Sequence, residues 1–304
     1  VQITGLANLA GGTMRGVQLA GISNISGNNT VGLSAAGLVN ITGDRTQGVI
    51  ISGLTSIGGD NTSGLMISGF MNVTGNMASG LHFSGAANIT GQSFGGLMAS
   101  GLLNVVGEHM NGLQMAGIAN ITASKLNGVQ IALCNYATQA RGLQIGLVNY
   151  YKEDMKGFQL GLVNANPDTR VQMMVYGGNA TPANIGVRFK NQLFYTILGI
   201  GSMYQGLNDK FSASASYRAG LSFTLYKGLS ISGDLGYQHI EAFDNKDEVI
   251  PKRLYALQAR ANLEYQFTRK FGIFATGGYG LTRFYNKSSN YDKGAIIEAG
   301  IVLF

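Results

Sequence analysis

The sequence predicts an all-β protein, in which an N-terminal β-solenoid of about sixteen-residue repeats precedes a small transmembrane β-barrel of about eight antiparallel strands. Three observations predict this architecture. A glycine recurs every sixteen residues from Gly16 to Gly128. Apolar and polar residues alternate strictly in long segments of the second half, as in 211–226. Composition also changes near Pro167: 30 of the 46 glycines precede residue 171, whereas 21 of the 28 Phe and Tyr residues follow residue 170. The expected domains are therefore residues 1–166 and 167–304.

The repeat has a clear copy in Gly112-Leu113-Gln114-Met115-Ala116-Gly117-Ile118-Ala119-Asn120-Ile121-Thr122. A fixed short period indicates small coils that pack only on their neighbours. Apolar columns that include Val17 and Leu19 lie two positions apart and share one strand face. Two further columns include Ile22 and Ile25. We expect these four columns to fill the inside of a stack that is roughly 50 Å long at about 4.8 Å per coil.

An asparagine stands between the third and fourth apolar columns of almost every coil, and only Ser56 interrupts the series. The apolar spacing of three around a polar residue predicts a bend at that point. A side-chain amide both donates and accepts, so stacked asparagines can form a ladder that also satisfies backbone groups. The expected ladder residues are Asn24, Asn40, Asn72, Asn88, Asn104, Asn120, Asn135, Asn149 and Asn164.

Charge is scarce in the repeats, and residues 1–140 hold only six charged side chains. A column predicted to face outward adds apolar groups in the middle coils, and exposed apolar patches tend to mark interaction sites. We therefore expect this column to dock a partner protein or the membrane surface. The alternative is a neutral rod that binds nothing, or only a glycan. The candidate docking residues are Ile50, Met66, His82 and Met98.

The second half contains eight candidate strands, at 170–177, 184–190, 193–204, 211–226, 229–243, 252–267, 271–285 and 294–304. Three connections are tight, whereas those at 177–184, 205–210, 244–251 and 286–293 are longer and polar. Transmembrane barrels have short periplasmic turns and longer extracellular loops, so both ends of this barrel are expected at the periplasmic side.

Charged residues on the polar face of these strands are expected inside the barrel. They could line a selective pore, but eight strands leave room only for side chains, so we favour ion pairs that fill the interior. The candidate lumen residues are Arg218, Asp234, Arg260, Glu264 and Glu298.

The chemistry of catalysis and cofactor binding has few candidates. His239 and Glu241 share a strand face near the extracellular rim, where His239 could act as a general base, but no serine nucleophile can be assigned to it. The other histidines lack a second ligand at metal spacing, and the single Cys134 excludes an intrachain disulfide or a cysteine cluster. The net charge of +6 comes from scattered basic residues without interleaved aromatics. We expect no enzymatic activity, cofactor, metal or nucleic-acid partner.

Two signals of export and membrane insertion remain. No apolar run is long enough for a transmembrane helix, and residue 1 is already in phase with the repeat, so any export signal is expected to lie outside this numbering. The ending Ile301-Val302-Leu303-Phe304 resembles the terminal-phenylalanine strand of outer-membrane β-barrels, although Glu298 and Gly300 depart from an ideal signal. The resemblance implies that Phe304 serves barrel insertion.

The segment Gly142-Leu143-Gln144-Ile145-Gly146-Leu147-Val148-Asn149 is similar to the repeat of bacterial surface-repeat proteins from spirochaetes and Bacteroidota. Together the two resemblances imply an outer-membrane protein of a Gram-negative bacterium. The expected function is a barrel-anchored repeat scaffold, an accessory subunit of an envelope complex that contacts membrane lipid and a protein partner. One alternative is a transport or hydrolytic barrel with the repeats as plug or spacer. Another is that the repeats form barrel wall.

Overall fold

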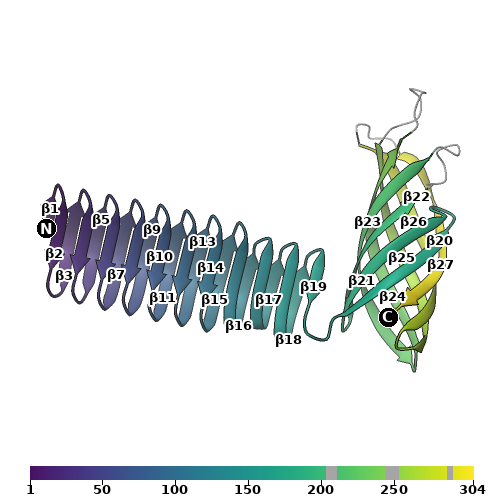
Figure 1. The fold of residues 1–304 in the computed structure, drawn as a ribbon, viewed down its shortest axis with the longest axis horizontal. Coiled ribbons are helices and arrows are strands. Elements are labelled where there is room, and N and C mark those ends of the chain that lie inside the picture. The colour runs from purple at the N-terminus through teal and green to yellow at the C-terminus, as the bar shows by residue number, and fades with distance from the viewer. Residues whose placement is uncertain (203–210, 244–252, 286–289) are drawn as a thin grey trace. The chain divides into compact units, whose positions relative to one another are not determined.

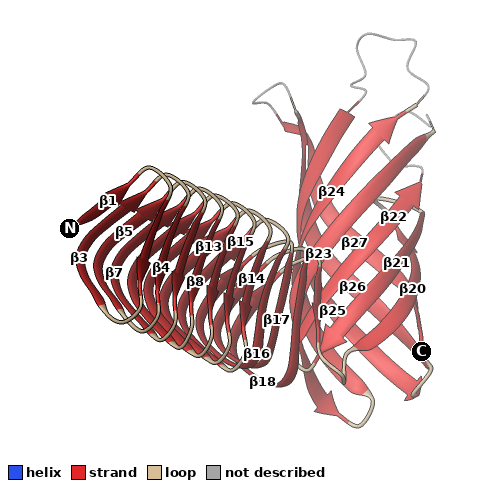
Figure 2. Ribbon diagram, turned by 60° about the vertical axis from the view of Figure 1, so that its left-hand side comes forward, coloured by secondary structure: helices blue, strands red, loops and turns tan. Residues whose placement is uncertain are grey.

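The computed structural model describes residues 1–202, 211–243, 253–285 and 290–304, and their regular secondary structure is entirely β (Figures 1 and 2). They contain no helix long and apolar enough to span a membrane. The chain divides into two compact units, Val1–Gly161 and Leu162–Phe304. The predicted loops at 205–210 and 244–251 lie outside the described residues, as does the first half of the loop at 286–293. The all-β solenoid and the closed barrel are both confirmed.

The first unit is a stack of coils, each built from one long and one short strand. Each strand pairs in parallel with the equivalent strand of the next coil, as in Gly64 with Gly80 and Asn72 with Asn88. The strands are β1 (Gln2–Thr4), β2 (Ala7–Ala10), β3 (Met14–Ala20), β4 (Ser23–Ser26), β5 (Thr30–Ala36), β6 (Val39–Thr42), β7 (Arg45–Ser52), β8 (Thr55–Gly58), β9 (Asn61–Ser68), β10 (Met71–Thr74), β11 (Met77–Ser84), β12 (Ala87–Thr90), β13 (Ser93–Ser100), β14 (Leu103–Val106), β15 (His109–Ala116), β16 (Ala119–Ile131), β17 (Cys134–Ile145) and β18 (Val148–Leu160).

The sixteen-residue register changes toward the end of the stack. In β16, β17 and β18 the two strands of a coil join into one, and the paired glycines Gly128 and Gly142 stand fourteen residues apart. The sequence already shows this shortening, because the glycine spacing contracts at the same place.

A glycine in the middle of each long strand sets the shape of the coil. Gly96 has φ +128°, in the region that L side chains rarely adopt. A Cβ at this position would lie 2.2 Å from the carbonyl oxygen of Gly80 in the preceding coil. Only glycine fits here, and this explains its recurrence at the same place in every coil.

The four apolar columns do not fill the inside of the coils, and this expectation is wrong. Asn72 points inward from the middle of β10, so its strand neighbours Met71 and Val73 must point outward. On the long strand Met66 points inward, and Leu65 and Ile67 lie on the outer side. The predicted bend at the asparagines is also wrong, because the chain turns at Gly69-Phe70, before the short strand.

The second unit begins with the short β19 (Val163–Ala165) and continues as a closed antiparallel barrel. Pairing of Val175 with Ile301 between the first and last barrel strands closes it. The barrel strands are β20 (Arg170–Gly178), β21 (Ala183–Asn191), β22 (Phe194–Ser202), β23 (Ser212–Tyr226), β24 (Leu229–Ala242), β25 (Arg253–Thr268), β26 (Phe271–Phe284) and β27 (Asn290–Leu303).

The two ends of the barrel differ. At one end, connections of two residues follow β21, β23 and β25. Arg170 starts the first barrel strand at this end, and the amide of Phe304 donates to the Lys270 carbonyl there, at 2.7 Å. By the rule for transmembrane barrels, the end with tight turns would be periplasmic.

The outer wall of the barrel is apolar, with aromatic residues near both ends. On β25, Leu257, Ala259 and Leu263 face outward, and Gln258 and Arg260 face inward. Tyr237, Tyr255 and Tyr285 contact one another at the end away from the tight turns. At the end with the tight turns, Phe267 contacts both Tyr265 and Phe271. Ten residues of tilted strand separate Tyr255 from Tyr265, which matches an apolar band of about 25 Å.

Candidate functional site

The interior of the barrel holds a chain of buried ion pairs. Near the tight turns, Arg188 on β21 donates from Nη1 to Oε2 of Glu264 at 2.5 Å and from Nη2 to Oε1 at 3.0 Å. Gln172 accepts from Nε of the same arginine at 2.9 Å. Both charged side chains are almost fully buried. This two-pronged geometry, with the other arginine donors also engaged, is the kind that offsets the desolvation of both charges.

A second cluster lies further along the lumen. Glu298 accepts from Nη2 of Arg218 at 3.2 Å, and its carboxylate lies 3.3 Å from Nε of Arg260. Tyr176 accepts from Nη2 of Arg218 at 3.0 Å. One carboxylate therefore neutralises two arginines, and a phenol oxygen supports one of them.

The third buried carboxylate belongs to Asp234, whose Oδ2 accepts from Tyr195 and from Asn262, each at 2.8 Å. Three arginines and three carboxylates thus face one another inside the barrel, and their charges sum to zero. The structure brings all five predicted lumen residues together and adds Arg188, which the sequence analysis missed. Its alternation with Asn184 and Gly186 carried the signal.

His239 and Glu241 lie on the outer wall, together with Tyr285 and Arg253. The Nδ1 atom of His239 lies 2.6 Å from the hydroxyl of Tyr285, and Nε2 lies 3.3 Å from Oε2 of Glu241. Arg253 donates to both oxygens of that glutamate, at 3.0 and 3.1 Å. Both ring nitrogens are engaged, so neither is left to activate a serine hydroxyl.

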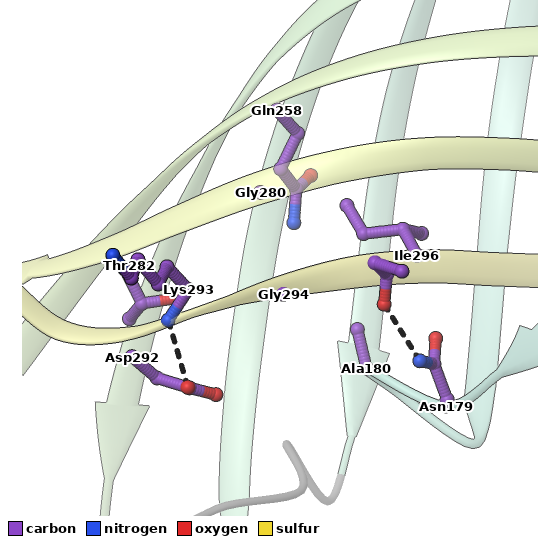
Figure 3. Close-up of a pocket in the computed structure, with 10 residues that line it drawn as sticks. Asn179, Ala180, Gln258, Gly280, Thr282, Asp292, Lys293, Gly294 and Ile296 are labelled. Atoms are coloured by element: carbon purple, nitrogen blue, oxygen red, sulfur yellow. Dashed lines mark hydrogen bonds between the residues drawn. The ribbon is translucent and has the colours of Figure 1, made fainter.

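A small hollow of about 220 Å³ opens beside the β20–β21 connection (Figure 3). Asn179 donates to the Ala295 carbonyl at 2.7 Å, and Asp292 accepts from the amide of Lys293 at 2.7 Å. The polar groups at its rim thus hold the local backbone. Over the described part of the chain, no group of three or more His, Cys, Asp or Glu residues is placed to hold a metal ion.

The asparagine ladder runs through the inside of the solenoid. Asn88 accepts from Nδ2 of Asn72 at 2.8 Å and donates to Oδ1 of Asn104 at 2.9 Å. Its Nδ2 also donates to the Ala99 carbonyl at 2.8 Å. Comparable bonds link Asn8, Asn24 and Asn40, and others continue through Asn120 and Asn135 to Asn149. Asn164 is buried in the second unit.

At the interruption of the ladder, serine hydroxyls take over. Ser56 bonds to Ser52 at 2.8 Å and to Ser68 at 3.0 Å. Ser68 then donates to Oδ1 of Asn72 at 2.6 Å, so polar contacts resume at the next asparagine.

The expected docking face does not exist at the predicted residues. Ile50, Met66, His82 and Met98 are between 0 and 3% exposed, because they point into the coils. They belong to the same inward column as Gln18, Gln114, Gln130 and Gln144. His82 packs edge-on against Phe94 at 5.0 Å, and burial lowers its pKa to about 4. The error has the same cause as that of the apolar columns: inside and outside were exchanged.

The outside of the solenoid has two unlike sides. One side is apolar. It consists of the turn at Gly69-Phe70, the equivalent turns of the other coils, and the outward residues of the strand segments on either side of each turn; we call it the apolar edge. The opposite turn, at Gly75-Asn76, together with the start of each long strand, is the polar edge. A groove of about 550 Å³ crosses the polar edge beside Asn61, Ser79 and Asn111. Figure 2 shows the turns of the coils as two tan rows.

Comparisons with known proteins add little. No protein-family model matches the chain, and no curated protein matches it. Among solved structures, the N-terminal β-barrel domain of Pseudomonas aeruginosa OprF is similar over 44% of this chain and 93% of that one, with 16% identity and a TM-score of 0.29. At this level of similarity, function must be inferred from the chain's own residues.

Proposed function

We propose that the protein is a non-enzymatic outer-membrane scaffold, in which the barrel is a closed anchor and the solenoid is the interacting part. The neutral set of buried charges inside the barrel, three arginines and three carboxylates, carries this proposal. A conducting pore needs a continuous aqueous path, whereas Arg188, Arg218 and Arg260 are each paired and nearly buried. An eight-stranded barrel has room for such side chains and little else.

A membrane location is supported by the two faces of the barrel. Leu235, Leu257 and Ile297 are 72, 47 and 67% exposed on the outer wall, where water would make them a liability. Lipid removes that cost, and aromatic residues near both ends match the two interfaces of a bilayer. Phe304 directly follows the last strand and remains the candidate insertion signal.

The accessory role belongs to the polar edge of the solenoid. Its groove presents the amides of Asn61 and Asn111 and the hydroxyl of Ser79 beside the exposed Met77, a mixed lining that suits a protein segment in an envelope complex. The hydrolytic alternative is disfavoured by the engagement of both His239 nitrogens, and the transport alternative by the filled lumen.

Fractionation of the full-length protein tests the membrane assignment. We expect it to remain with outer membranes after a carbonate wash and to migrate faster on gels before heating than after, because a folded barrel binds less detergent. Recovery as a soluble monomer without detergent, with no heat-dependent shift, would refute the proposal.

A further inference from the structure

We propose that the apolar edge of the solenoid is immersed in the interfacial layer of a phospholipid membrane, so that the coils lie along the bilayer. The inference rests on the proposed function, since it requires a chain held at a membrane.

The apolar edge is continuous through the coils. Five outward columns form it, with Leu65, Ile67, Phe70, Met71 and Val73 as one coil's contribution. At the turn itself Leu54, Phe70, Leu102 and Ile118 are 49 to 54% exposed. At about 4.8 Å per coil, the ten coils give an apolar stripe on the order of 50 Å long.

Charge is confined to the other side. In register, every charged side chain of the first unit falls between the end of a short strand and the glycine in the next long strand, which is the polar edge. These residues are Arg15, Asp44, Arg45, Asp60, Glu108, Lys125, Arg141, Lys152, Glu153, Asp154 and Lys156. Such a division into an apolar side and a charged side is typical of elements that lie in a membrane interface.

Backbone amides at the turn of the apolar edge find their acceptors within the protein. The amides of Gly69, Phe70 and Met71 donate to carbonyls of the preceding coil at 2.9 to 3.1 Å. The carbonyl of Phe83, next to the turn, accepts from the side chain of Asn72 at 2.8 Å. Contact with lipid demands this, because hydrocarbon offers no partner to an open backbone group.

The shape of the edge favours lipid over a second copy or another protein. The five columns lie on both sides of a turn. A flat protein partner would therefore cover the columns on only one side, whereas acyl chains can surround a convex edge. A protein interface also needs hydrogen bonds and a polar rim. In the described coils, the columns offer only the hydroxyls of Ser23, Thr55, Tyr136 and Tyr150 and the thiol of Cys134, a weak donor. Because the chain enters the barrel at the end with tight turns, the membrane would be the periplasmic, phospholipid leaflet.

Tryptophan fluorescence can test this cleanly, because the chain contains no tryptophan. Leu102→Trp places the probe in a column that already accommodates Phe70, and Gln92→Trp places a matched probe on the polar edge. Each full-length variant is reconstituted into vesicles of phosphatidylethanolamine and phosphatidylglycerol, with or without brominated acyl chains. Insertion to interfacial depth should lower the emission of the probe at position 102 about twofold in brominated vesicles. The probe at position 92 should stay unchanged.

Each other outcome contradicts the inference in a distinct way. Equal emission at position 102 in both vesicles, with the barrel showing its heat-dependent gel shift, overturns it and leaves the proposed anchor intact. A blue-shifted emission that bromine does not quench, with cross-linking between chains, assigns the edge to a second copy. Absence of both the gel shift and the quenching defeats anchor and inference together. If Leu102→Trp fails to fold, Ile118→Trp reports on the same column.

Discussion

At the scale of single residues, the inward asparagine does two things at once. Asn88 continues the ladder between Asn72 and Asn104, and it also satisfies the Ala99 carbonyl where the long strand approaches its turn. A buried amide with fewer partners would carry a desolvation cost of about 1–3 kcal/mol. The coil therefore needs a hydrogen-bonding side chain at this position, an amide in most coils and a serine at Ser56, rather than an apolar residue of similar size.

Replacing Asn88 by Leu should lower the free energy of unfolding of the solenoid by about 3 kcal/mol, since the Ala99 carbonyl and the neighbouring amides lose their partner. Urea unfolding in detergent, followed by circular dichroism, measures the change. Gln92→Leu is the control, because Gln92 is exposed and should tolerate the change. Equal losses in the two variants would show that the ladder is not what stabilises the coils.

We expect His82 to make the solenoid less stable in acid. Burial lowers its folded-state pKa to about 4, whereas the unfolded value is 6.5. The contribution of neutral His82 to the free energy of unfolding is complete above pH 6.5. It declines as the pH falls toward 4, because between these two values only the unfolded chain takes up the proton. The total loss is about 3 kcal/mol.

The urea midpoint of the solenoid measured at pH 7.5 and at pH 4.5 checks this prediction. His82→Met, which continues the column of Met66 and Met98, should remove most of the difference. A pH dependence that persists unchanged in this variant would assign the effect to other groups.

The ladder residues from Asn24 to Asn149 and five of the six buried lumen charges could be predicted from the sequence, but the direction of the solenoid columns could not. The sequence pattern alone favours apolar residues on the inside, as in most soluble folds. Asn88 contradicts this, because a buried residue in the middle of a strand forces Ala87 and Ile89 outward. The ladder and the apolar interior were therefore incompatible expectations, and period-two geometry alone could have shown it.

At the scale of the elements, the glycine columns and the barrel turns determine the fold. Seven of the eight barrel strands begin and end within two residues of the predicted positions, because alternation and tight turns define them. The last strand begins at Asn290 rather than at 294. The polar residues Asp292 and Lys293 are typical of a loop, but they belong to the strand. They extend the strand beyond the apolar band.

Substitutions at the adjacent residues Gly95 and Gly96 can show whether the glycine column is needed for its backbone conformation or only for the small size of the residue. Gly96→Ala should cost more than about 2 kcal/mol, because it combines a positive φ with a Cβ that meets the Gly80 carbonyl. Gly95→Ala meets nothing within 4 Å and should be neutral or slightly stabilising. Urea midpoints of the two variants give the comparison, and similar values would mean that the position of Gly96 tolerates a side chain.

At the scale of the whole molecule, both units enclose polar groups among buried apolar ones, and both present apolar strand faces outward. In the barrel the interior holds paired charges such as Arg188 with Glu264, and in the solenoid it holds uncharged amides. Both arrangements suit a surrounding that is partly lipid. Composition alone reveals the sparse charge of the repeats, but the register between coils is needed to see that this charge is confined to one edge.

Conductance of the full-length protein in a planar lipid bilayer tests the central claim, a closed membrane anchor, most directly. Insertion is first verified by the heat-dependent gel shift of the same preparation. The buried pairs formed by Glu264 and Glu298 predict an inserted barrel with no unitary current steps at neutral pH. Reproducible, voltage-stable steps from the inserted protein would contradict the closed anchor and support a transport barrel instead.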